Sequence, residues 1–382
     1  MANVSSSNGL EKRPNLRFPN FDEPWKVFRA EELFKNIADK NHPAETVLTI
    51  VQGKGTLPRE NAGRNIHYDN ASLSNYKKVE KGDYIIHLRS FEGGLEMANE
   101  DGIVSPAYTI LRCKKPHSSL FYEAYFHTDE FINHVLSKSV EGIRDGRQIS
   151  YDAFKWLGLP YCSLPEQEKI SNLFSALNRR IEKQQQLVDA LKKYKRGAIA
   201  YILSGKSIEF DVEATWTEKT LADLCCEFRS GRNISAALIH ESGDYPVYGG
   251  NGIRGYCDHY SHEGEYVVVG RQGALCGNVR LIQGQNYLSE HAIAVRANEN
   301  NDTKFLLFLL DFMNLGQYSD QGAQPGLAVN KLLRLKCNVP EKKTQSKISS
   351  FLLTFDRQIA AQESLLAFLT DQRKAFLQQL FI

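Results

Sequence analysis

Apolar residues recur at alternating intervals of four and three along two long stretches of the chain. The first stretch runs from Glu168 to Leu203, and the same pattern begins again 178 positions later, where Ile348 corresponds to Ile170. This spacing places the apolar residues on one side of an α-helix, as in helices that pair along their length. The seam positions are Ile170, Phe174, Leu177, Ile181, Gln184, Val188, Leu191 and Lys195, and then Ile348, Leu352, Phe355, Ile359, Gln362, Leu366, Leu369 and Arg373.

Two polar interruptions of the seam are repeated as well, Gln184 with Gln362 and Lys195 with Arg373. Two unrelated surface helices, each covering its own domain, would not need to share these interruptions. We therefore predict two homologous long helices that pair with each other. A parallel pair would place Lys195 against Arg373, whereas an antiparallel pair brings Gln184 near Arg373 and Lys195 near Gln362. The second arrangement gives each cation an acceptor and is the one we predict.

The sequence that precedes each long helix is also repeated. The segment Gly82–Ile86 returns as Gly264–Val268, and this alignment places Arg89 opposite Arg271. Short runs rich in β-branched residues and bounded by turn residues predict strands, and a longer apolar segment predicts a helix. The strands are expected at Thr46–Val51, Tyr84–Leu88, Tyr108–Arg112 and Leu157–Cys162, and the helical segment from Ser119 to Ser139.

These repeats predict an α+β fold with two mixed α/β globular domains. The domains are expected to be related by a pseudo-twofold axis and joined by two long helices that form an antiparallel coiled coil. The expected boundaries are a partly disordered segment 1–20, globular domain 1 at 21–162, a central helix at 163–206, globular domain 2 at 207–338, and a distal helix at 339–382. A chain of 382 residues is long enough for this division.

Composition narrows the class of protein. The net charge of +2 argues against a protein that coats nucleic acid without specificity, although specific binding needs only local clusters of Arg and Lys. The apolar runs are too short to span a bilayer, and the polar first residues lack an apolar signal core, so a cytoplasmic location is expected. Seven scattered cysteines without a Cys-x-x-Cys pair argue against a disulfide framework or a zinc site.

Motifs for catalysis are missing from the sequence. It contains no P-loop, no Gly-x-Gly-x-x-Gly run and no Asn/Asp-Pro-Pro-Tyr/Phe segment. His259 and His262 are the closest approach to a metal-binding pair, and a pair of ordinary loop histidines is the favoured interpretation. Carboxylates near the predicted strands, such as Asp83 and Glu92, are interpreted as solvated or turn-forming. We therefore expect no catalytic residue and no metal site in this chain.

Several sequence segments of the chain resemble recurrent motifs of the specificity subunits of type I restriction-modification systems. They lie in the expected order around the duplicated helix, and the resemblance covers nearly the whole chain apart from its first dozen residues. The segments are Phe91–Gly94, Gly102–Tyr108, Leu164–Ile170, Tyr245–Tyr256, Gly270–Asn278 and Tyr287–Ser289.

The resemblance implies a division of labour. Each globular domain would be a target recognition domain for one half of a split double-stranded DNA sequence, and the helices would set the spacing. The helices would also dock modification subunits, expected to be two, and restriction subunits through them. The family implies S-adenosylmethionine, ATP and Mg²⁺ in those partner subunits, no cofactor in this chain, and no catalysis by it. The alternative is a non-enzymatic coiled-coil scaffold whose globular domains bind proteins.

The strongest candidates for DNA contact are Arg89 and Arg271, which follow the same predicted strand in the two domains. A guanidinium there could bind a guanine edge or a phosphate, and the alternative is an ion pair inside each domain. Further candidates, each equally well explained as an ordinary surface residue, are Lys54, Arg59, Arg64 and Arg147 in the first domain and Arg229, Arg232, Arg254 and Lys331 in the second.

Overall fold

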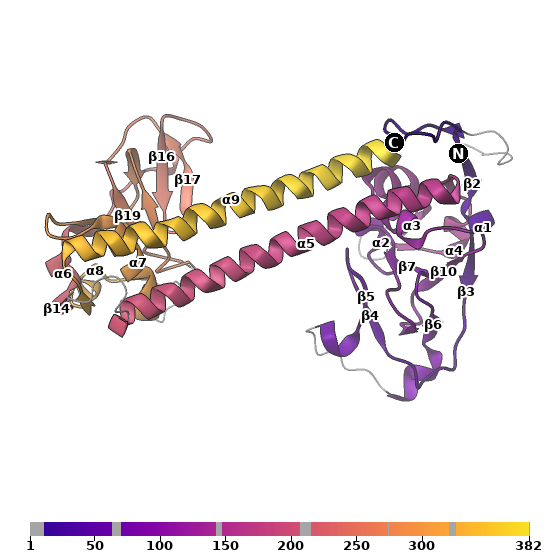
Figure 1. Cartoon of the computed structure of the whole chain (residues 1–382), viewed down its shortest axis with the longest axis horizontal. Coiled ribbons are helices and arrows are strands. Elements are labelled where there is room, and N and C mark those ends of the chain that lie inside the picture. Colours follow the sequence, from indigo (N-terminus) through magenta and orange to yellow (C-terminus); the bar gives the residue numbers. More distant parts are fainter. Residues whose placement is uncertain are drawn as a thin grey trace. The chain divides into compact units, whose positions relative to one another are not determined.

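The computed structural model describes residues 11–62, 70–142, 147–206, 215–273, 275–320 and 326–381. The chain forms two compact units (Figure 1). Unit 1 comprises residues 1–184 and 365–382, and unit 2 comprises residues 185–364. Each unit consists of a mixed α/β body and a part of both long helices, so the predicted α+β architecture is confirmed. Over the described residues, no helix is both long and apolar enough to cross a bilayer.

Each unit is built on an antiparallel four-stranded sheet, and the two sheets have equivalent strand orders. The unit 1 sheet has the order β3 (Phe34–Ile37), β10 (Thr109–Cys113), β7 (Tyr84–Ile86), β8 (Glu96–Met97). The unit 2 sheet has the order β15 (Cys225–Ser230), β22 (Ala292–Ala297), β19 (Tyr266–Gly270), β20 (Val279–Ile282). The repeated segments Gly82–Ile86 and Gly264–Val268 therefore contain β7 and the first half of β19, which are corresponding inner strands.

Smaller elements complete unit 1. Its other strands are β1 (Glu11–Lys12), β2 (Trp25–Arg29), β4 (Leu48–Val51), β5 (Gly55–Pro58), β6 (Lys77–Val79), β9 (Gly102–Val104), β11 (Val140–Glu141), β12 (Gln148–Ile149) and β13 (Gly158–Tyr161). Its short helices are α1 (Ala30–Leu33), α2 (Ser90–Gly93), α3 (Ser119–Phe126) and α4 (Tyr151–Phe154), with 3₁₀ turns η1 (Arg59–Ala62), η2 (Asn70–Asn75) and η4 (Leu136–Ser139) and the π turn η3 (Glu130–Val135).

Unit 2 has a comparable set of smaller elements. Its other strands are β14 (Thr217–Thr220), β16 (Tyr245–Gly249), β17 (Gly252–Cys257), β18 (His262–Glu263), β21 (Gln285–Leu288) and β23 (Lys336–Val339). Its helices are α6 (Leu221–Leu224), α7 (Thr303–Phe312) and α8 (Val329–Leu332), with the π turn η6 (Ile202–Lys206) and 3₁₀ turns η7 (Ala236–Leu238) and η8 (Leu315–Tyr318).

The helix predicted from Ser119 to Ser139 is shorter than expected, because α3 ends at Phe126. The buried Thr128 hydroxyl donates to the Tyr125 carbonyl and accepts from the Phe131 amide, so it takes two backbone groups that a continuous helix would pair differently. A π turn and a 3₁₀ turn continue the segment to Ser139.

The N-terminal segment was expected to be partly disordered over residues 1–20. Residues 1–10 lie outside the described residues, and the described part, residues 11–20, is held by specific contacts. Strand β1 pairs with β2, and the Leu16 amide donates to the Gln379 carbonyl at 3.0 Å. The Arg17 guanidinium makes two hydrogen bonds, of 2.9 and 2.8 Å, to the buried carboxylate of Glu166. This segment therefore connects parts of unit 1 that are far apart in sequence.

The core of unit 1 is unusually rich in aromatic side chains. Phe34, Tyr84, Tyr122 and Phe126 surround one another, with ring centroids 5.1–6.2 Å apart. The buried ring of Phe381, from the last long helix, joins this core. In unit 2 the core is mainly aliphatic, and both long helices contribute to it through Ile199, Ile348 and Leu352, with Ile202 and Leu203 of the π turn η6 that follows the first of them. The helix ends are thus parts of the globular cores.

The long helices are α5 (Leu164–Tyr201) and α9 (Lys342–Phe381), and they pack antiparallel in each unit. In unit 1 the Arg373 Nε atom donates to Asn178 Oδ1 at 2.6 Å. In unit 2, Lys192 lies 2.7 Å from Glu363, and Lys195 pairs with Asp356. Residue numbers thus rise along one helix as they fall along the other. Every predicted seam residue is buried or half-buried.

The contacts described for the two seam cations involve other partners than the predicted glutamines: Lys195 pairs with Asp356, and Arg373 bonds Asn178. Gln184 and Gln362 have interactions of their own, so their predicted proximity to the two cations stays a prediction. Both contacts are displaced by six residues from the predicted positions, from 362 to 356 and from 184 to 178. Docking of the apolar helix ends into the two cores explains this register, because burying those side chains outweighs the gain from a polar pair at a half-exposed seam.

A repeated glutamine ties each long helix to its own unit. The amide of Gln167 donates to the Cys162 carbonyl at 2.8 Å and accepts from the Ser118 amide at 3.1 Å. Gln345 does the same with the Pro340 carbonyl, at 2.9 Å, and the Asp302 amide, at 3.0 Å. Both side chains are buried, and each joins the start of the long helix to the preceding strand and to the start of α3 or α7.

We expect Gln167→Ala and Gln345→Ala each to lower the free energy of unfolding by about 1–3 kcal/mol, because each leaves buried backbone groups without partners. The exposed Gln378 on the same helix as Gln345 is a matched control, and its change to alanine should alter stability by less than about 0.5 kcal/mol. Denaturant unfolding of the three variants measures the difference. Equal effects at the buried and exposed positions would contradict the anchoring role.

Candidate nucleic-acid interface

Arg89 and Arg271 follow the corresponding strands β7 and β19, as the alignment predicted. Arg89 is the N-cap of α2 and its side chain is 74% exposed. In the described structure its nearest carboxylate is that of Glu92, at 3.9 Å. The half-buried Arg271 directs its Nη1 atom to the Glu290 carbonyl at 3.2 Å. Both arginines thus stand at the end of an inner strand, on the turn that follows it.

The ion-pair alternative can be weighed against these contacts. An exposed pair 3.9 Å apart contributes little stability, so Glu92 does not bind Arg89 firmly. Within the described residues, the polar partner of the Arg271 guanidinium is a neutral carbonyl oxygen. Over the part of the chain that the structure describes, neither arginine has a buried carboxylate as its partner, so both remain available to an anionic ligand.

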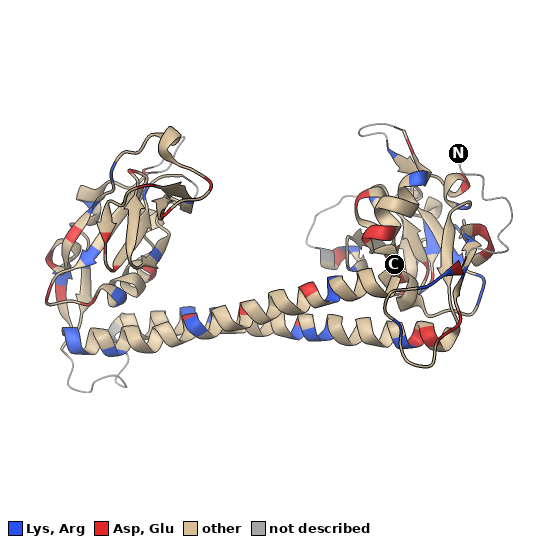
Figure 2. Cartoon of the chain, turned by 90° about the horizontal axis from the view of Figure 1, so that it is seen from above, with Lys and Arg blue, Asp and Glu red and all other residues tan. Residues whose placement is uncertain are grey.

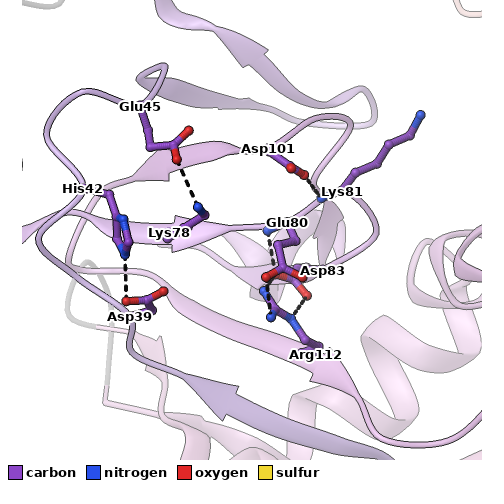
Figure 3. Close-up of polar contacts among 9 residues, drawn as sticks. All are labelled: Asp39, His42, Glu45, Lys78, Glu80, Lys81, Asp83, Asp101 and Arg112. Atoms are coloured by element: carbon purple, nitrogen blue, oxygen red, sulfur yellow. Dashed lines mark hydrogen bonds and ion pairs between the residues drawn. The ribbon is translucent and has the colours of Figure 1, made fainter.

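Arg112 shows what a structural arginine looks like in unit 1 (Figure 3). It makes two hydrogen bonds to Asp83, of 2.8 and 2.7 Å, and one of 2.7 Å to Glu80. The hydrogen bond with Asp83 is the main cause that raises the pKa of Arg112. Asp83 also accepts from the Glu80 amide, so its turn-forming interpretation holds, although it is buried and not solvated.

The same view shows three further polar contacts that fix surface segments of unit 1. Lys78 pairs with Glu45 at 3.0 Å, His42 with Asp39 at 2.8 Å, and the Lys81 amide donates to Asp101 at 2.8 Å. The side chains of Lys78 and His42 thus have structural partners close by, and they are weaker candidates for DNA contact than Arg89.

Three segments of unit 1 converge at the turn that carries Arg89. The tip of the β4–β5 hairpin, which carries Lys54, reaches α2, since any side chain at Gly93 would collide with the Gln52 amide. From the other side, the Arg147 guanidinium lies over the Phe91 ring at 4.2 Å. The structure thus brings together Lys54, Arg89 and Arg147, three residues that sequence reasoning had named separately.

Unit 2 has a comparable junction. The tip of the β16–β17 hairpin packs on the backbone that follows β19, since a side chain at Gly250 would collide with the Gln272 carbonyl. Gln272 in turn forms a bridge with Gly326. Next to this junction is a polar cavity of about 160 Å³, lined by Tyr248, Gly249, Gly250, Asn251, Gly252, Val268, Gly270, Asn278, Val279, Arg280 and Asp311.

Arg280 was missed by the sequence reasoning. It lies on β20 opposite Val268 of β19, and this pairing brings it to the cavity beside the hairpin tip. A side chain at Gly252 would come within 3.2 Å of its Nη1 atom. The signal in the sequence was weak, because Arg280 lies outside the repeated phrases and only the strand pairing places it there.

The remaining candidates differ in how strongly they are engaged. Arg229 donates to Glu227 at 2.7 Å, and Lys331 pairs with Asp320 at 2.7 Å. Arg254, on β17, packs against Gly249 and lies near the junction of unit 2. The Arg59 guanidinium lies 5.9 Å from the centroid of the Tyr76 ring. The backbone amide of Arg232 donates to the Leu288 carbonyl. Arg64 lies outside the described residues.

Charge is dispersed over the molecule. Figure 2 shows Lys and Arg intermixed with Asp and Glu in both units. An interface for nucleic acid would therefore depend on a few placed cations and not on a broad basic field. Among the described residues, no three His, Cys, Asp or Glu side chains lie close enough to share a metal ion, and all seven cysteines are free.

Comparisons with known proteins agree with this organisation. The family model for the type I restriction modification DNA specificity domain matches residues 213–370. The EcoprrI type I restriction enzyme specificity subunit of Escherichia coli is 45% identical over 148 residues, which cover 38% of this chain. The match spans 37% of the length of that relative.

Solved structures resemble the chain over nearly its whole length. The S subunit of a type I restriction-modification system from M. genitalium superposes with a TM-score of 0.64 at 17% identity, covering 97% of this chain and 99% of the other. A structure that describes complex assembly and conformational transition of a type I system gives a TM-score of 0.56 at 16% identity, covering 95% and 98%. At these identities the similarity concerns the fold.

Proposed function

We propose that this chain is a specificity subunit of a type I restriction-modification system, the DNA-recognition chain of such a complex. Each unit would recognise one half of a bipartite sequence in double-stranded DNA. The long helices would set the distance between the halves and dock modification subunits, two of them in our proposal. Methyl transfer and DNA cleavage would come from the partner subunits with their S-adenosylmethionine, ATP and Mg²⁺.

The observation that carries the proposal is the equivalence of Arg89 and Arg271. Each follows the corresponding inner strand, stands where a hairpin tip meets the next turn, and has no buried carboxylate as its partner among the described residues. An arginine at the corresponding position of each unit is suited to a chain that recognises two half-sites, one with each unit. A guanidinium can bind a guanine edge or a phosphate through two hydrogen bonds.

We expect Arg89→Ala to weaken binding at one half-site and Arg271→Ala at the other, each by about 1–3 kcal/mol if the contact is bidentate to a base. The full chain is co-expressed with a modification subunit, bound sequences are selected from a random duplex pool, and affinities are measured by fluorescence anisotropy. Lys81→Ala is the control in unit 1, since Lys81 is exposed at the opposite end of β7.

The outcomes separate the proposal from its rivals. A loss of melting temperature without loss of affinity would support internal ion pairs for these arginines. Absence of any DNA binding, with or without the modification subunit, would favour the coiled-coil scaffold that binds proteins.

A further inference from the structure

The tip of the β4–β5 hairpin is fixed by a carboxylate from another strand. The Gly53 amide donates to Glu96 Oε1 at 2.7 Å, and the Gly55 amide donates to Glu96 Oε2 at 2.9 Å. The amide of Lys54, between them, donates to the Val51 carbonyl at 2.9 Å. All three amides of the tip are thus used inside unit 1, so the tip presents the exposed Lys54 side chain, and not its backbone, to a ligand.

Glu96 is itself held from behind. It lies on β8 with its side chain 1% exposed, and His127 Nε2 lies 3.2 Å from Glu96 Oε1. The other ring nitrogen of His127 faces the Glu123 carbonyl at 2.8 Å. Both ring nitrogens therefore face acceptors, which favours the imidazolium form.

The pKa values of the pair agree with this geometry. Burial opposes the charged form of Glu96, but hydrogen bonds from His127 and from the Gly53 and Gly55 amides outweigh it and lower the pKa of Glu96. Burial also opposes the charged form of His127, yet the contacts with Glu96 raise the pKa of His127. Glu96 and His127 therefore form a buried ion pair, and Glu96 accepts two further hydrogen bonds from the Gly53 and Gly55 amides.

A second side chain holds the same tip. The Asn99 Nδ2 atom donates to the Lys54 carbonyl at 2.7 Å and to the Thr56 carbonyl at 2.9 Å. Gly53 and Gly55 both have φ near +75°, a conformation that other residues rarely adopt. The tip thus has one backbone shape, set by two glycines and by polar groups of β8 and the turn after it.

We propose that Glu96 is a positioning residue that holds the β4–β5 tip, and with it Lys54, in the geometry that contacts DNA. This inference rests on the proposed function, since it concerns the junction where the segments that carry Lys54, Arg89 and Arg147 converge. The tip in unit 2 is braced differently, by close backbone contacts of Gly250 and by the Ser289 amide, which donates to the Tyr248 carbonyl. A change at Glu96 should therefore act on one half-site only.

The test variant is Glu96→Gln, which keeps the size of the side chain but turns an NH₂ group towards at least one N–H donor. In the full chain, hydrogen exchange of the backbone amides of residues 51–57 should accelerate by about tenfold or more, as expected when charge-assisted hydrogen bonds are lost. In complex with the modification subunit, affinity for the half-site weakened by Arg89→Ala should fall by about tenfold, and the other half-site should keep its affinity.

Two further variants isolate the cause. Glu100→Gln removes an exposed carboxylate four residues away and should change neither measurement. Lys54→Ala should lower affinity for the same half-site without accelerating exchange. If Glu96→Gln does not fold, Asn99→Ala loosens the same tip without disturbing the buried ion pair.

Several results would overturn the inference. Unchanged exchange at the tip would show that Glu96 does not hold it. Faster exchange with unchanged affinity, while Arg89→Ala still weakens that half-site, would remove the positioning role and leave the proposed function intact. If none of Arg89→Ala, Lys54→Ala and Glu96→Gln alters DNA binding, this junction is not the DNA interface of unit 1, and the inference fails. If the full chain binds no DNA with or without the modification subunit, the proposed function fails as well.

Discussion

Replacing Phe381 with alanine should destabilise unit 1 by about 3–5 kcal/mol, the range found when a buried Phe is truncated. The ring is fully buried, with its centroid 5.3–6.2 Å from the rings of Trp25, Phe121, Tyr125 and Phe174. These rings come from a strand, from α3 and from the other long helix, so the cavity would open where four segments meet. Aromatic edge contacts are lost in addition to buried area.

The measurement is thermal unfolding followed by the fluorescence of Trp25, with Trp156 and Trp216 changed to phenylalanine so that Trp25 alone emits. Phe368→Ala is the matched control, because Phe368 lies on the same helix and is 56% exposed. It should shift stability by less than about 0.5 kcal/mol. Equal destabilisation by both variants would mean that Phe381 is not part of the unit 1 core.

Much of the fold was visible in the sequence because it is repeated. The spacing of the seam predicted two paired long helices, and the repeated strand phrases predicted two related α/β bodies. The helix ends were harder to predict, since Leu352 satisfies the same apolar pattern as residues further along the seam and Phe381 lies outside that pattern. Only the structure shows that these ends enter the globular cores.

The candidate site was predicted less completely. Arg89 and Arg271 could be aligned because each follows a recognisable strand. The hydrogen-bond partners of Glu96 lie 41–43 residues away in the sequence, and Arg280 reaches the cavity of unit 2 only because β20 pairs with β19. No local spacing in the sequence encodes such contacts. Carboxylates near strands looked alike in the sequence, yet Asp83 fixes a turn and Glu96 fixes a hairpin. Their different partners, and not their neighbours in sequence, determine this difference.

The polar seam residues illustrate a different limit. Gln184 and Arg373 were assigned to each other because their amide and guanidinium are chemically complementary. The observed contacts of Arg373 with Asn178 and of Lys195 with Asp356 are equally complementary at a register six residues away. Polar complementarity therefore restricts the helices to an antiparallel direction but leaves several registers open, and the core residues decide among them.

This register allows a sharp test of the helices as a ruler. Deleting one heptad, Gln184–Ala190, from α5 alone would leave the facing helix too long. Deleting the opposing heptad Ala361–Ala367 as well keeps the Asn178–Arg373 and Lys195–Asp356 contacts in register. The matched double deletion removes about 10 Å of helix at ~1.5 Å per residue, which corresponds to roughly three base pairs at ~3.4 Å each.

We expect the double deletion to shorten the spacing between the half-sites by up to about three base pairs without changing the bases recognised in either. Sequences selected from a random duplex pool, in complex with the modification subunit, measure spacing and base preference in one experiment. The deletion of Gln184–Ala190 alone is the control. It should lower the free energy of unfolding, because the seam contacts on one side of the deletion are shifted by seven residues. Half-sites that keep their spacing but change their bases would contradict the ruler, because the helices would then act on recognition within a unit.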